Sequence, residues 1–398
     1  MTDTFVLTLN VGSSSLKFSV FTIGGAVEPW LSGKFDQVGR SETRFELKDT
    51  AGAVHSKAIG PTSQRAAAEF LFERLDELVG LAQLKAIGLR VVHGGPRYRR
   101  PAPIDGEMIE YLRQIRAFAP EHLPAELEVI ESCRTRFPTV PLIACFDTGF
   151  HHGMPVVARI LPIPRRFAAK GVERFGFHGL SYSFLLDELE RQAGAAAARG
   201  RLVLAHLGNG ASLAAVHNGQ SIDTSMGFTP AAGVPMGTRS GDLDPGLVLY
   251  LAQTEGMDAV AFDRMVNHES GLLGVSETSS DMRELLERET GDSRAAEALA
   301  LFCYRVKKTI GAFAAALGGL DTLVFTGGVG ENSATIRERI CDGLDFLGVD
   351  LDPAANEAGD PLISSPRNRV AVRVVRTDEE AVIVKAIMEF LGHKEAAQ

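Results

Sequence analysis

The chain has 398 residues, of which 45% are hydrophobic and 23% charged, and its formal net charge is −9. This length exceeds what one hydrophobic core usually supports, so we expect two globular domains and exclude a largely disordered chain. The acidic balance argues against bulk attraction to nucleic acid, and the longest apolar stretch is too short to span a bilayer. No secretion signal opens the sequence, so we expect a cytoplasmic location.

Strand and helix patterns alternate along the chain, which predicts an α/β fold. The sequence predicts strands over 6–9, 18–22, 86–92, 141–146, 201–205, 213–216 and 323–325. It predicts helices over 64–79, 181–193, 281–286, 294–317 and 333–342. The dipeptides Gly24-Gly25 and Asn218-Gly219 both favour two-residue hairpin turns. We therefore expect each half to begin with an antiparallel hairpin, unlike an all-parallel Rossmann sheet.

Three segments rich in glycine and small polar residues, 10–17, 206–212 and 327–332, each follow a predicted strand. Glycine lets the backbone approach a ligand closely, and small Ser and Asn residues leave N–H groups free to bind phosphate oxygens. The pattern predicts a phosphate cradle for a nucleotide. Neither a P-loop nor a G-x-G-x-x-G sequence occurs, which excludes the commonest nucleotide-binding motifs.

Two pairs of segments resemble each other in the same order. Residues 6–16 resemble 203–213, and the strand with its glycine turn at 86–95 resembles 323–328. One hydrophobic strand followed by a glycine turn resembles another by chance, but two matches in order indicate an internal duplication. A duplicated α/β protein with a hairpin phosphate loop in each half is the arrangement of the superfamily of acetate and sugar kinases, heat-shock chaperones and actin.

Within that superfamily the sequence resembles the acetate kinases. Seven segments match the motifs of that family in order, from residue 5 to 380: 10–18, 90–95, 145–151, 175–179, 206–212, 236–245 and 327–332. The resemblance implies a duplicated actin-like ATPase fold of two domains with an interdomain active-site cleft. It implies an N-terminal domain of residues 1–147 completed by a C-terminal helix over 379–398, and a second domain over 148–378 that carries the nucleotide site.

The family transfers a phosphoryl group reversibly between ATP and acetate, giving ADP and acetyl phosphate, with Mg²⁺ as the metal and Mn²⁺ as an alternative to it. The resemblance also implies a homodimer, with no nucleic-acid or membrane partner. Two alternatives stay open at this stage. One is a kinase for propionate or butyrate, and the other is an actin-like or chaperone-like ATPase module that switches shape for a protein partner.

Four residues are the catalytic candidates. Phosphoryl transfer needs charge neutralised on the transferring group, and Arg90 and Arg239 lie beside glycines where a guanidinium can bind carboxylate or phosphate. Arg90 could equally be a surface arginine at a strand end. The resemblance gives His178 hydrogen bonding to the phosphoryl group, although a core histidine is an alternative. It places Asp147 near the metal or orienting Arg239, although a turn or helix cap would also explain it.

The remaining site residues come from the same resemblance. The acetate pocket would contain Arg90, Val92, Phe177 and Pro230. The metal would be held by Asn10 and Glu379, because Thr377 and Glu380 have the spacing of a helix capping box that explains Glu380 structurally. The nucleotide would be bound by Asn10, Ser13, Ser15, Lys17, His206, Leu207, Gly208, Asn209, Gly210, Asp281, Met282, Arg283, Gly328, Val329, Gly330, Glu331 and Asn332.

Some features depart from the family or suggest a different site. Glu121 stands where the family has a leucine that touches the methyl group of acetate, and we expect it to point to solvent because a buried carboxylate is costly. His151 and His152 next to Asp147 suggest a metal site, which we reject because Mg²⁺ prefers oxygen ligands. The four cysteines are too scattered for a disulfide framework or a thiolate metal site.

Overall fold

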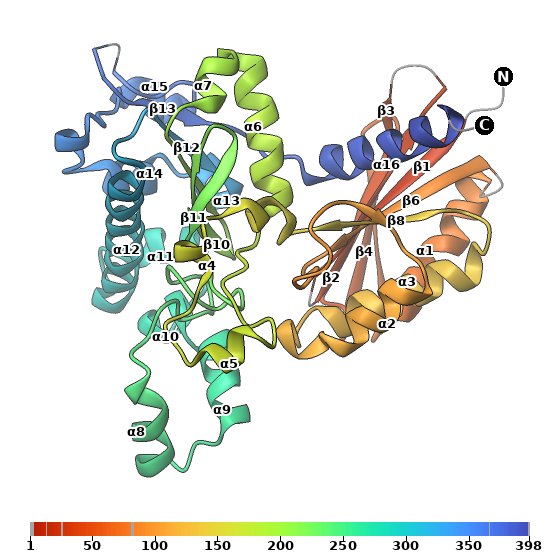
Figure 1. The fold of residues 1–398 in the computed structure, drawn as a ribbon, viewed down its shortest axis with the longest axis horizontal. Helices are drawn as coiled ribbons and strands as arrows, with labels where there is room; N and C mark the ends of the chain where they lie inside the picture. The colour runs from red at the N-terminus through yellow and green to blue at the C-terminus, as the bar shows by residue number, and fades with distance from the viewer. Residues whose placement is uncertain (1–3, 13, 25–26, 81–82, 366, 397–398) are drawn as a thin grey trace. The chain divides into compact units, whose positions relative to one another are not determined.

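The computed structural model describes residues 4–12, 14–24, 27–80, 83–365 and 367–396. The chain divides into two compact units (Figure 1), of which unit 1 comprises residues 1–149 and 378–398 and unit 2 comprises residues 150–377. Each unit contains one β-sheet. None of the helices in the described ranges has the length and apolar character needed to cross a membrane.

Unit 1 has an eight-stranded sheet in the order β5-β4-β3-β2-β1-β6-β8-β7. Its strands are β1 (Phe5–Val11), β2 (Ser15–Thr22), β3 (Glu28–Asp36), β4 (Thr43–Lys48), β5 (Val54–Gly60), β6 (Leu84–Val91), β7 (Ala102–Pro103) and β8 (Leu142–Phe146). Its helices are α1 (Gln64–Val79), α2 (Gly106–Gln114), α3 (Leu123–Arg136) and α16 (Glu379–Ala396), with 3-10 turns at Arg116–Phe118 and, at the unit boundary, Gly149–Gly153.

Three neighbouring strands of unit 1, β1, β6 and β8, run parallel to one another. Helix α16 covers one face of this sheet, and helices α1 and α3 cover the other (Figure 1). The approach of α16 depends on Gly88 in β6, since a Cβ there would lie 2.3 Å from Cγ2 of Ile383. Because parallel strands end at the same edge, the carboxyl ends of β1, β6 and β8 bring residues 10, 90 and 147 together.

Unit 2 has a five-stranded sheet in the order β11-β10-β9-β12-β13. Its strands are β9 (Leu202–Leu207), β10 (Ala211–His217), β11 (Gln220–Thr224), β12 (Thr322–Thr326) and β13 (Ala371–Val374). Its helices are α4 (Val156–Arg159), α5 (Arg165–Ala168), α6 (Gly179–Ala193), α7 (Ala195–Arg199), α8 (Gly246–Thr254), α9 (Ala259–Arg264), α10 (Gly271–Ser276), α11 (Met282–Arg288), α12 (Ser293–Leu317), α13 (Gly327–Asn332), α14 (Ala334–Cys341) and α15 (Pro353–Ala358), with a π turn at Met265–Glu269 and a 3-10 turn at Asp345–Leu347.

Helices α6 and α12 cover opposite faces of the unit 2 sheet (Figure 1). The face beneath α6 is apolar because alternate residues of a strand point to one side, as Leu202 and Leu204 do in β9. Tyr182, Leu185 and Leu189 of α6 pack on it. This packing fixes the first turn of α6 at the end of the sheet where β9 and β12 finish.

The predicted duplication is confirmed by the strand order. The series β3-β2-β1-β6-β8 in unit 1 and β11-β10-β9-β12-β13 in unit 2 have the same pattern, in which the first three strands are antiparallel neighbours and the last three are parallel. The predicted turn at Asn218-Gly219 is also confirmed, with φ of 53° and 72° between β10 and β11. The turn predicted at Gly24-Gly25 includes Gly25, which lies outside the described residues.

Two local predictions are wrong. The glycine-rich segment 327–332, which the pattern of a strand followed by a glycine turn predicts as a loop, forms the short helix α13. The capping box of Thr377 and Glu380 does not form, because Oδ1 of Asp378 accepts the N–H of Ala381 at 3.0 Å and so caps α16. Glu380 instead accepts a hydrogen bond from the hydroxyl of Ser19. Asp378, one residue after Thr377, is thus the capping residue, and the Thr377 hydroxyl donates to Ser181 instead.

Candidate active site

The carboxyl ends of β1, β6 and β8 in unit 1 carry a buried ion pair. Nε of Arg90 donates to Oδ1 and Oδ2 of Asp147 at 3.0 and 3.1 Å, and Nη2 donates to Oδ2 at 2.5 Å. Asp147 is fully buried and cannot be solvated by water. The forked contact with Arg90 balances the charge of its carboxylate instead. Nη1 of Arg90 donates to Oδ1 of Asn10 at 3.1 Å. A guanidinium has five N–H donors, so Arg90 can hold these partners and still bind a carboxylate.

Glu379, the first residue of α16, completes this group. Its Oε2 accepts from Nδ2 of Asn10 at 3.0 Å and lies 3.9 Å from Nε of Arg90. Burial alone lowers the pKa of Arg90, but the neighbouring Asp147 and Glu379 carboxylates raise it above its ordinary value. The arginine is therefore a permanent cation that holds an amide and two carboxylates at one sheet edge.

A buried glutamate that we did not predict lies behind this group. Glu126 of α3 is 1% exposed, and its Oε1 accepts the N–H of Val92, just after β6, at 3.0 Å. Burial raises the pKa of this carboxyl to about 8, although the nearby Arg90 charge and the hydrogen bond from Val92 oppose the change. A sequence signal existed, because Leu123, Glu126 and Leu127 have the i, i+3, i+4 spacing of a buried helical face.

The other candidates in unit 1 are less enclosed. Lys17 is exposed on β2, opposite Asn10 in the strand register, and Ser15 is half-buried at the start of the same strand. Ser13 lies outside the described residues. Glu121 is exposed, in agreement with the expectation that it points to solvent.

In unit 2 the backbone holds His178 in an unusual conformation. Its φ is 59°, in the left-handed region, directly before α6 begins. Such a conformation costs about 1–3 kcal/mol for a residue with a Cβ, and it persists where the surroundings fix it. Nδ1 of the ring lies 2.8 Å from the hydroxyl of Ser212, which itself lies 2.5 Å from the Tyr182 hydroxyl. The hydrogen bond between Nδ1 and Ser212 thus holds the imidazole in one orientation.

The ring of His206 stacks on that of His178, with centroids 4.2 Å apart and an angle of 24° between the planes. Nδ1 of His206 lies 2.8 Å from the hydroxyl of Ser181, which accepts from Thr377 at 2.9 Å. These contacts join the end of β9, the first turn of α6 and the end of the unit 2 chain. His206 therefore supports one side of the His178 ring.

The loop that carries Arg239 is held from two sides. Met236 donates its N–H to the carbonyl of Arg239 at 3.0 Å, which closes a tight turn, and the N–H of Gly237 donates to the carbonyl of Asn209 at 3.1 Å. Gly271, with φ of 63°, lets α10 approach so closely that a Cβ there would lie 2.1 Å from the Met236 carbonyl. The loop is thereby fixed to both the β9–β10 turn and α10.

Arg239 and His178 meet at Gly210. A Cβ on this glycine would lie 3.5 Å from Nη1 of Arg239 and 3.5 Å from Nε2 of His178. A cation and an imidazole nitrogen therefore lie over the backbone of the second glycine-rich segment. Hydrogen-bond donors that converge in this way suit an anion on which negative charge develops.

A pocket of about 710 Å³ opens beside this group within unit 2. Its lining combines backbone of the glycine-rich segments 206–212 and 327–332 with apolar side chains such as Met282 and Leu286. This mixture suits the phosphates and the base of a nucleotide. Its lining residues are Gly208, Asn209, Leu272, Ser280, Asp281, Met282, Arg283, Leu286, Glu287, Gly328, Val329, Asn332 and Ser333. Sequence reasoning missed Leu272, Ser280, Leu286, Glu287 and Ser333 in this set.

Of the predicted nucleotide residues in unit 2, five are not part of that lining, namely His206, Leu207, Gly210, Gly330 and Glu331. Leu207 and Gly330 are buried in the fold. Oε1 of Glu331 accepts from the Thr326 hydroxyl at 3.2 Å and from the N–H groups of Gly327 and Thr377 at 2.9 and 3.2 Å. Glu331 therefore ties α13 to β12 and to the segment that leads into α16.

His151, the buried member of the histidine pair at 151–152, has a structural explanation. Nε2 of His151 donates to the carbonyl of Phe177 at 3.0 Å, and Nδ1 accepts from the hydroxyl of Ser221 at 2.8 Å. Burial lowers the pKa of His151 to about 4, so it is neutral under physiological conditions. His151 thus positions Phe177, which is 2% exposed, beside His178. Pro230, the other apolar candidate in unit 2, is half-buried.

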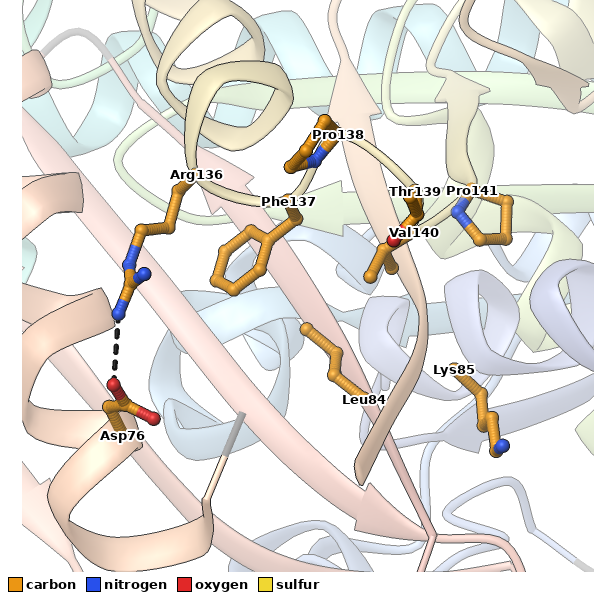
Figure 2. Close-up of a pocket in the computed structure, with 9 residues that line it drawn as sticks. All are labelled: Asp76, Leu84, Lys85, Arg136, Phe137, Pro138, Thr139, Val140 and Pro141. Atoms are coloured by element: carbon orange, nitrogen blue, oxygen red, sulfur yellow. Dashed lines mark hydrogen bonds and ion pairs between the residues drawn. The ribbon is translucent and has the colours of Figure 1, made fainter. Parts of the chain in front are cut away.

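A separate hollow of about 440 Å³ lies in unit 1, at the amino ends of β6 and β8 (Figure 2). Its walls carry the ion pair of Arg136 and Asp76, at 2.9 Å, while Lys85 lies apart from that pair. It lies at the opposite end of β6 from Arg90. The described residues around it form no cluster of catalytic groups, so we place the active site at the carboxyl ends of the strands.

The duplicated fold, the Arg90 cluster at the unit 1 sheet edge and the nucleotide-sized pocket define a kinase of the actin-like ATPase superfamily. The chain matches the Acetokinase family over residues 5–385. It is 44% identical over 395 residues to an acetate kinase of Rhizobium meliloti, covering 97% of this chain and 98% of that protein. The chain therefore belongs to the acetokinase family and is an enzyme, a carboxylate kinase.

Two solved structures agree with this assignment. The crystal structure of Porphyromonas gingivalis acetate kinase has a TM-score of 0.88 and 36% identity, covering 98% of this chain and 100% of that chain. A propionate kinase from Francisella tularensis has a TM-score of 0.90 and 34% identity, covering 96% of this chain and 98% of that one. The predicted family and the predicted actin-like fold are confirmed.

Proposed function

We propose that the protein phosphorylates acetate with ATP, reversibly giving acetyl phosphate and ADP by direct in-line transfer. A carboxylate oxygen of acetate attacks the γ-phosphorus of ATP, and the bond from that phosphorus to the β,γ-bridging oxygen breaks as ADP leaves. The observation that carries this proposal is the convergence of Arg239 and His178 on Gly210 beside a pocket of about 710 Å³. A carboxylate nucleophile is already ionised, so no catalytic base is required.

We assign the acetate carboxylate to Arg90 and the methyl group to Val92, Phe177 and Pro230. Asp147 fixes the plane of the Arg90 guanidinium, and a fixed fork binds a carboxylate with less loss of side-chain entropy. The buried surfaces of Val92 and Phe177 favour a short apolar chain. Unit 1 would thus supply the charge that holds the acceptor.

We assign the nucleotide to the unit 2 pocket and the transferring phosphoryl group to His178 and Arg239. If the Tyr182 hydroxyl donates to Ser212, the Ser212 hydroxyl is left to donate to Nδ1 of His178. The neutral ring then carries its proton on Nε2 and donates it to a phosphoryl oxygen. Arg239 neutralises charge on the same group, as arginines do in other phosphoryl-transfer enzymes.

We propose Mg²⁺ as the metal, held from the protein side by Glu379 and Asn10. The Asn10 amide and the Glu379 carboxylate are in contact at the sheet edge, and oxygens of both kinds are the hard ligands that Mg²⁺ prefers. Within the described ranges no group of three or more acidic, histidine or cysteine side chains could hold a metal alone. This donor set fits an ion that takes its remaining ligands from ATP and water. When bound, Mg²⁺ would neutralise phosphate charge.

Acyl phosphate formation tests the proposal directly. The protein is supplied with MgATP and, in parallel, acetate, propionate or butyrate, and the product is trapped with hydroxylamine as a hydroxamate. We expect acetate to give the highest kcat/KM. Preference for propionate would keep the kinase and change its substrate, as the similarity to a propionate kinase structure allows. ATP hydrolysis without any hydroxamate would favour an ATPase switch module instead.

Replacing Glu121 by leucine is expected to change the preference between acetate and propionate by less than about tenfold, or roughly 1.4 kcal/mol. The reason is that the Glu121 side chain is exposed and takes no place in an apolar pocket. The ratio of kcat/KM for the two acids is the measurement. A larger shift would mean that position 121 contacts the acyl chain and would overturn the assignment of the pocket.

We also propose a cytoplasmic homodimer in which the predicted domains, 1–147 with 379–398 and 148–378, form each protomer. The four cysteines are all free and buried, which suits a reducing compartment. Helices α8 and α9 expose large apolar side chains, including Leu249, Tyr250 and Val260. An exposed apolar surface of this kind is typical of an interface, and a second copy would bury it.

Replacing Leu249 by aspartate is expected to convert the dimer to monomer at micromolar concentration, because a charge would be buried at the interface. Sedimentation velocity measures the change. The matched control is Val54→Asp, which places the same charge at an equally exposed apolar residue of β5 in unit 1. Dimerisation unaffected by Leu249→Asp would exclude α8 as the interface.

A further inference from the structure

Glu126 is a carboxyl that the mechanism above does not use. It lies on the inner face of α3, is 1% exposed, and uses Oε1 to hold the N–H of Val92. Its other oxygen, Oε2, is buried and has no hydrogen-bond partner among the described residues. An ionised carboxylate with one bare oxygen in the interior is costly, whereas a protonated acid buries far less charge.

Burial favours the neutral form of Glu126, and the charge of Asp147 adds to this effect, whereas the charge of Arg90 opposes it. Arg90 faces it from β6 and Asp147 from the end of β8, and these two are the charged groups that act on it. Arg90 is already shared between Asp147 and Glu379. A charged Glu126 would therefore add a third carboxylate around one guanidinium, at the place where an anionic acceptor must bind.

We propose that Glu126 is a positioning residue of the acetate half-site, which as a neutral acid fixes the Val92 backbone and leaves the charge of Arg90 available to the substrate carboxylate. The inference rests on the proposed function, because it assigns Arg90 and Val92 to acetate. It adds to the acetate half-site a residue that lies outside the seven matched motifs, and it requires that residue to be protonated.

This arrangement implies a dependence on pH. Burial raises the pKa of Glu126 to about 8, so the acid loses its proton when the pH rises through that value. Acetate then meets an additional negative charge beside Arg90. If the ionised form does not bind acetate, the KM for acetate rises about tenfold for each pH unit above the pKa. The KM for MgATP, whose pocket is formed by unit 2 residues, should not follow this change.

The test is the KM for acetate at about pH 7 and about pH 9, at saturating MgATP, in the wild-type protein and in Glu126→Gln. Glutamine keeps the acceptor for Val92 and the shape of the protonated acid but cannot ionise. We expect a rise of about tenfold in the wild type and less than about twofold in Glu126→Gln. The matched control is Glu128→Gln, on the same helix and partly exposed, which should keep the rise of the wild type.

Two results would overturn the inference. One is an equal rise in wild type and Glu126→Gln, since another group would then be titrating. The other is a wild-type KM for acetate that does not change between about pH 7 and pH 9. This second measurement uses only the wild-type protein, so it does not depend on whether a variant folds. Both differ from failure of the proposed function, in which the wild type forms no acyl phosphate at any pH.

Discussion

Replacing Arg239 by alanine is expected to lower kcat by roughly 10³- to 10⁵-fold, the effect of removing an arginine that stabilises a transferring phosphoryl group. The contacts of the loop explain why the loss falls on kcat. The turn at 236–239 is held by its own backbone bonds and by Asn209, so it should survive removal of the side chain. Binding of MgATP, measured by calorimetry, should therefore change much less than kcat.

Two variants make this prediction specific. Arg239→Lys keeps the charge and loses the planar fork, so it should recover only part of the lost rate. Arg264→Ala removes an arginine of the same unit that is exposed and paired with Glu269, and it should leave kcat near that of the wild type. A kcat for Arg239→Ala within about tenfold of the wild type would remove Arg239 from the mechanism.

Much of the fold could be predicted because its signals are local. A continuous apolar run defines β9. The hairpin turn at Asn218-Gly219 needs two positive φ angles that these residues accept readily. The repeated order of strand, turn and strand revealed the duplication. The capping box failed because two acceptors, Thr377 and Asp378, compete for one helix end, and the spacing of residues does not show which one wins.

The site was harder to predict where burial decides the role of a residue. Glu121 drew attention because it differs from the family pattern, yet it is exposed, while Glu126 on the following helix is buried against Val92. Both are glutamates in the same acidic stretch. The spacing of Glu126 with Leu123 and Leu127 indicates a buried helical face, but its contact with Val92 depends on how α3 packs on the sheet, which is a tertiary property.

Two arginines of α14 also have different burial that the sequence does not reveal. Arg337 and Arg339 are two residues apart and look alike in the sequence, but Arg337 is 1% exposed whereas Arg339 lies near the surface in an ion pair with Glu289. Nη1 of Arg337 donates to the carbonyls of Gly330 and Glu331 at 2.9 and 3.0 Å. A buried cation thus holds the carboxyl end of the glycine-rich helix α13.

Replacing Arg337 by methionine is expected to lower the free energy of unfolding by about 3–5 kcal/mol. Nε and Nη2 of Arg337 also donate to the side chain and the carbonyl of Asn356 in α15, at 2.8 and 2.6 Å. Methionine fills much of the volume but leaves these buried acceptors without donors, and each unsatisfied group costs about 1–3 kcal/mol. Urea unfolding followed by circular dichroism measures the change.

The Arg337→Met substitution should also weaken nucleotide binding. Because α13 supplies Gly328, Val329 and Asn332 to the pocket, loosening it should raise the KM for MgATP more than it lowers kcat. Arg339→Met is the matched control, and we expect it to cost no more than about 1 kcal/mol because its ion pair is partly exposed. Equal losses in the two variants would mean that the buried bonds of Arg337 contribute no more than a surface ion pair. The order of the two effects follows from burial alone, since helix, residue type and the loss of one positive charge are the same in both.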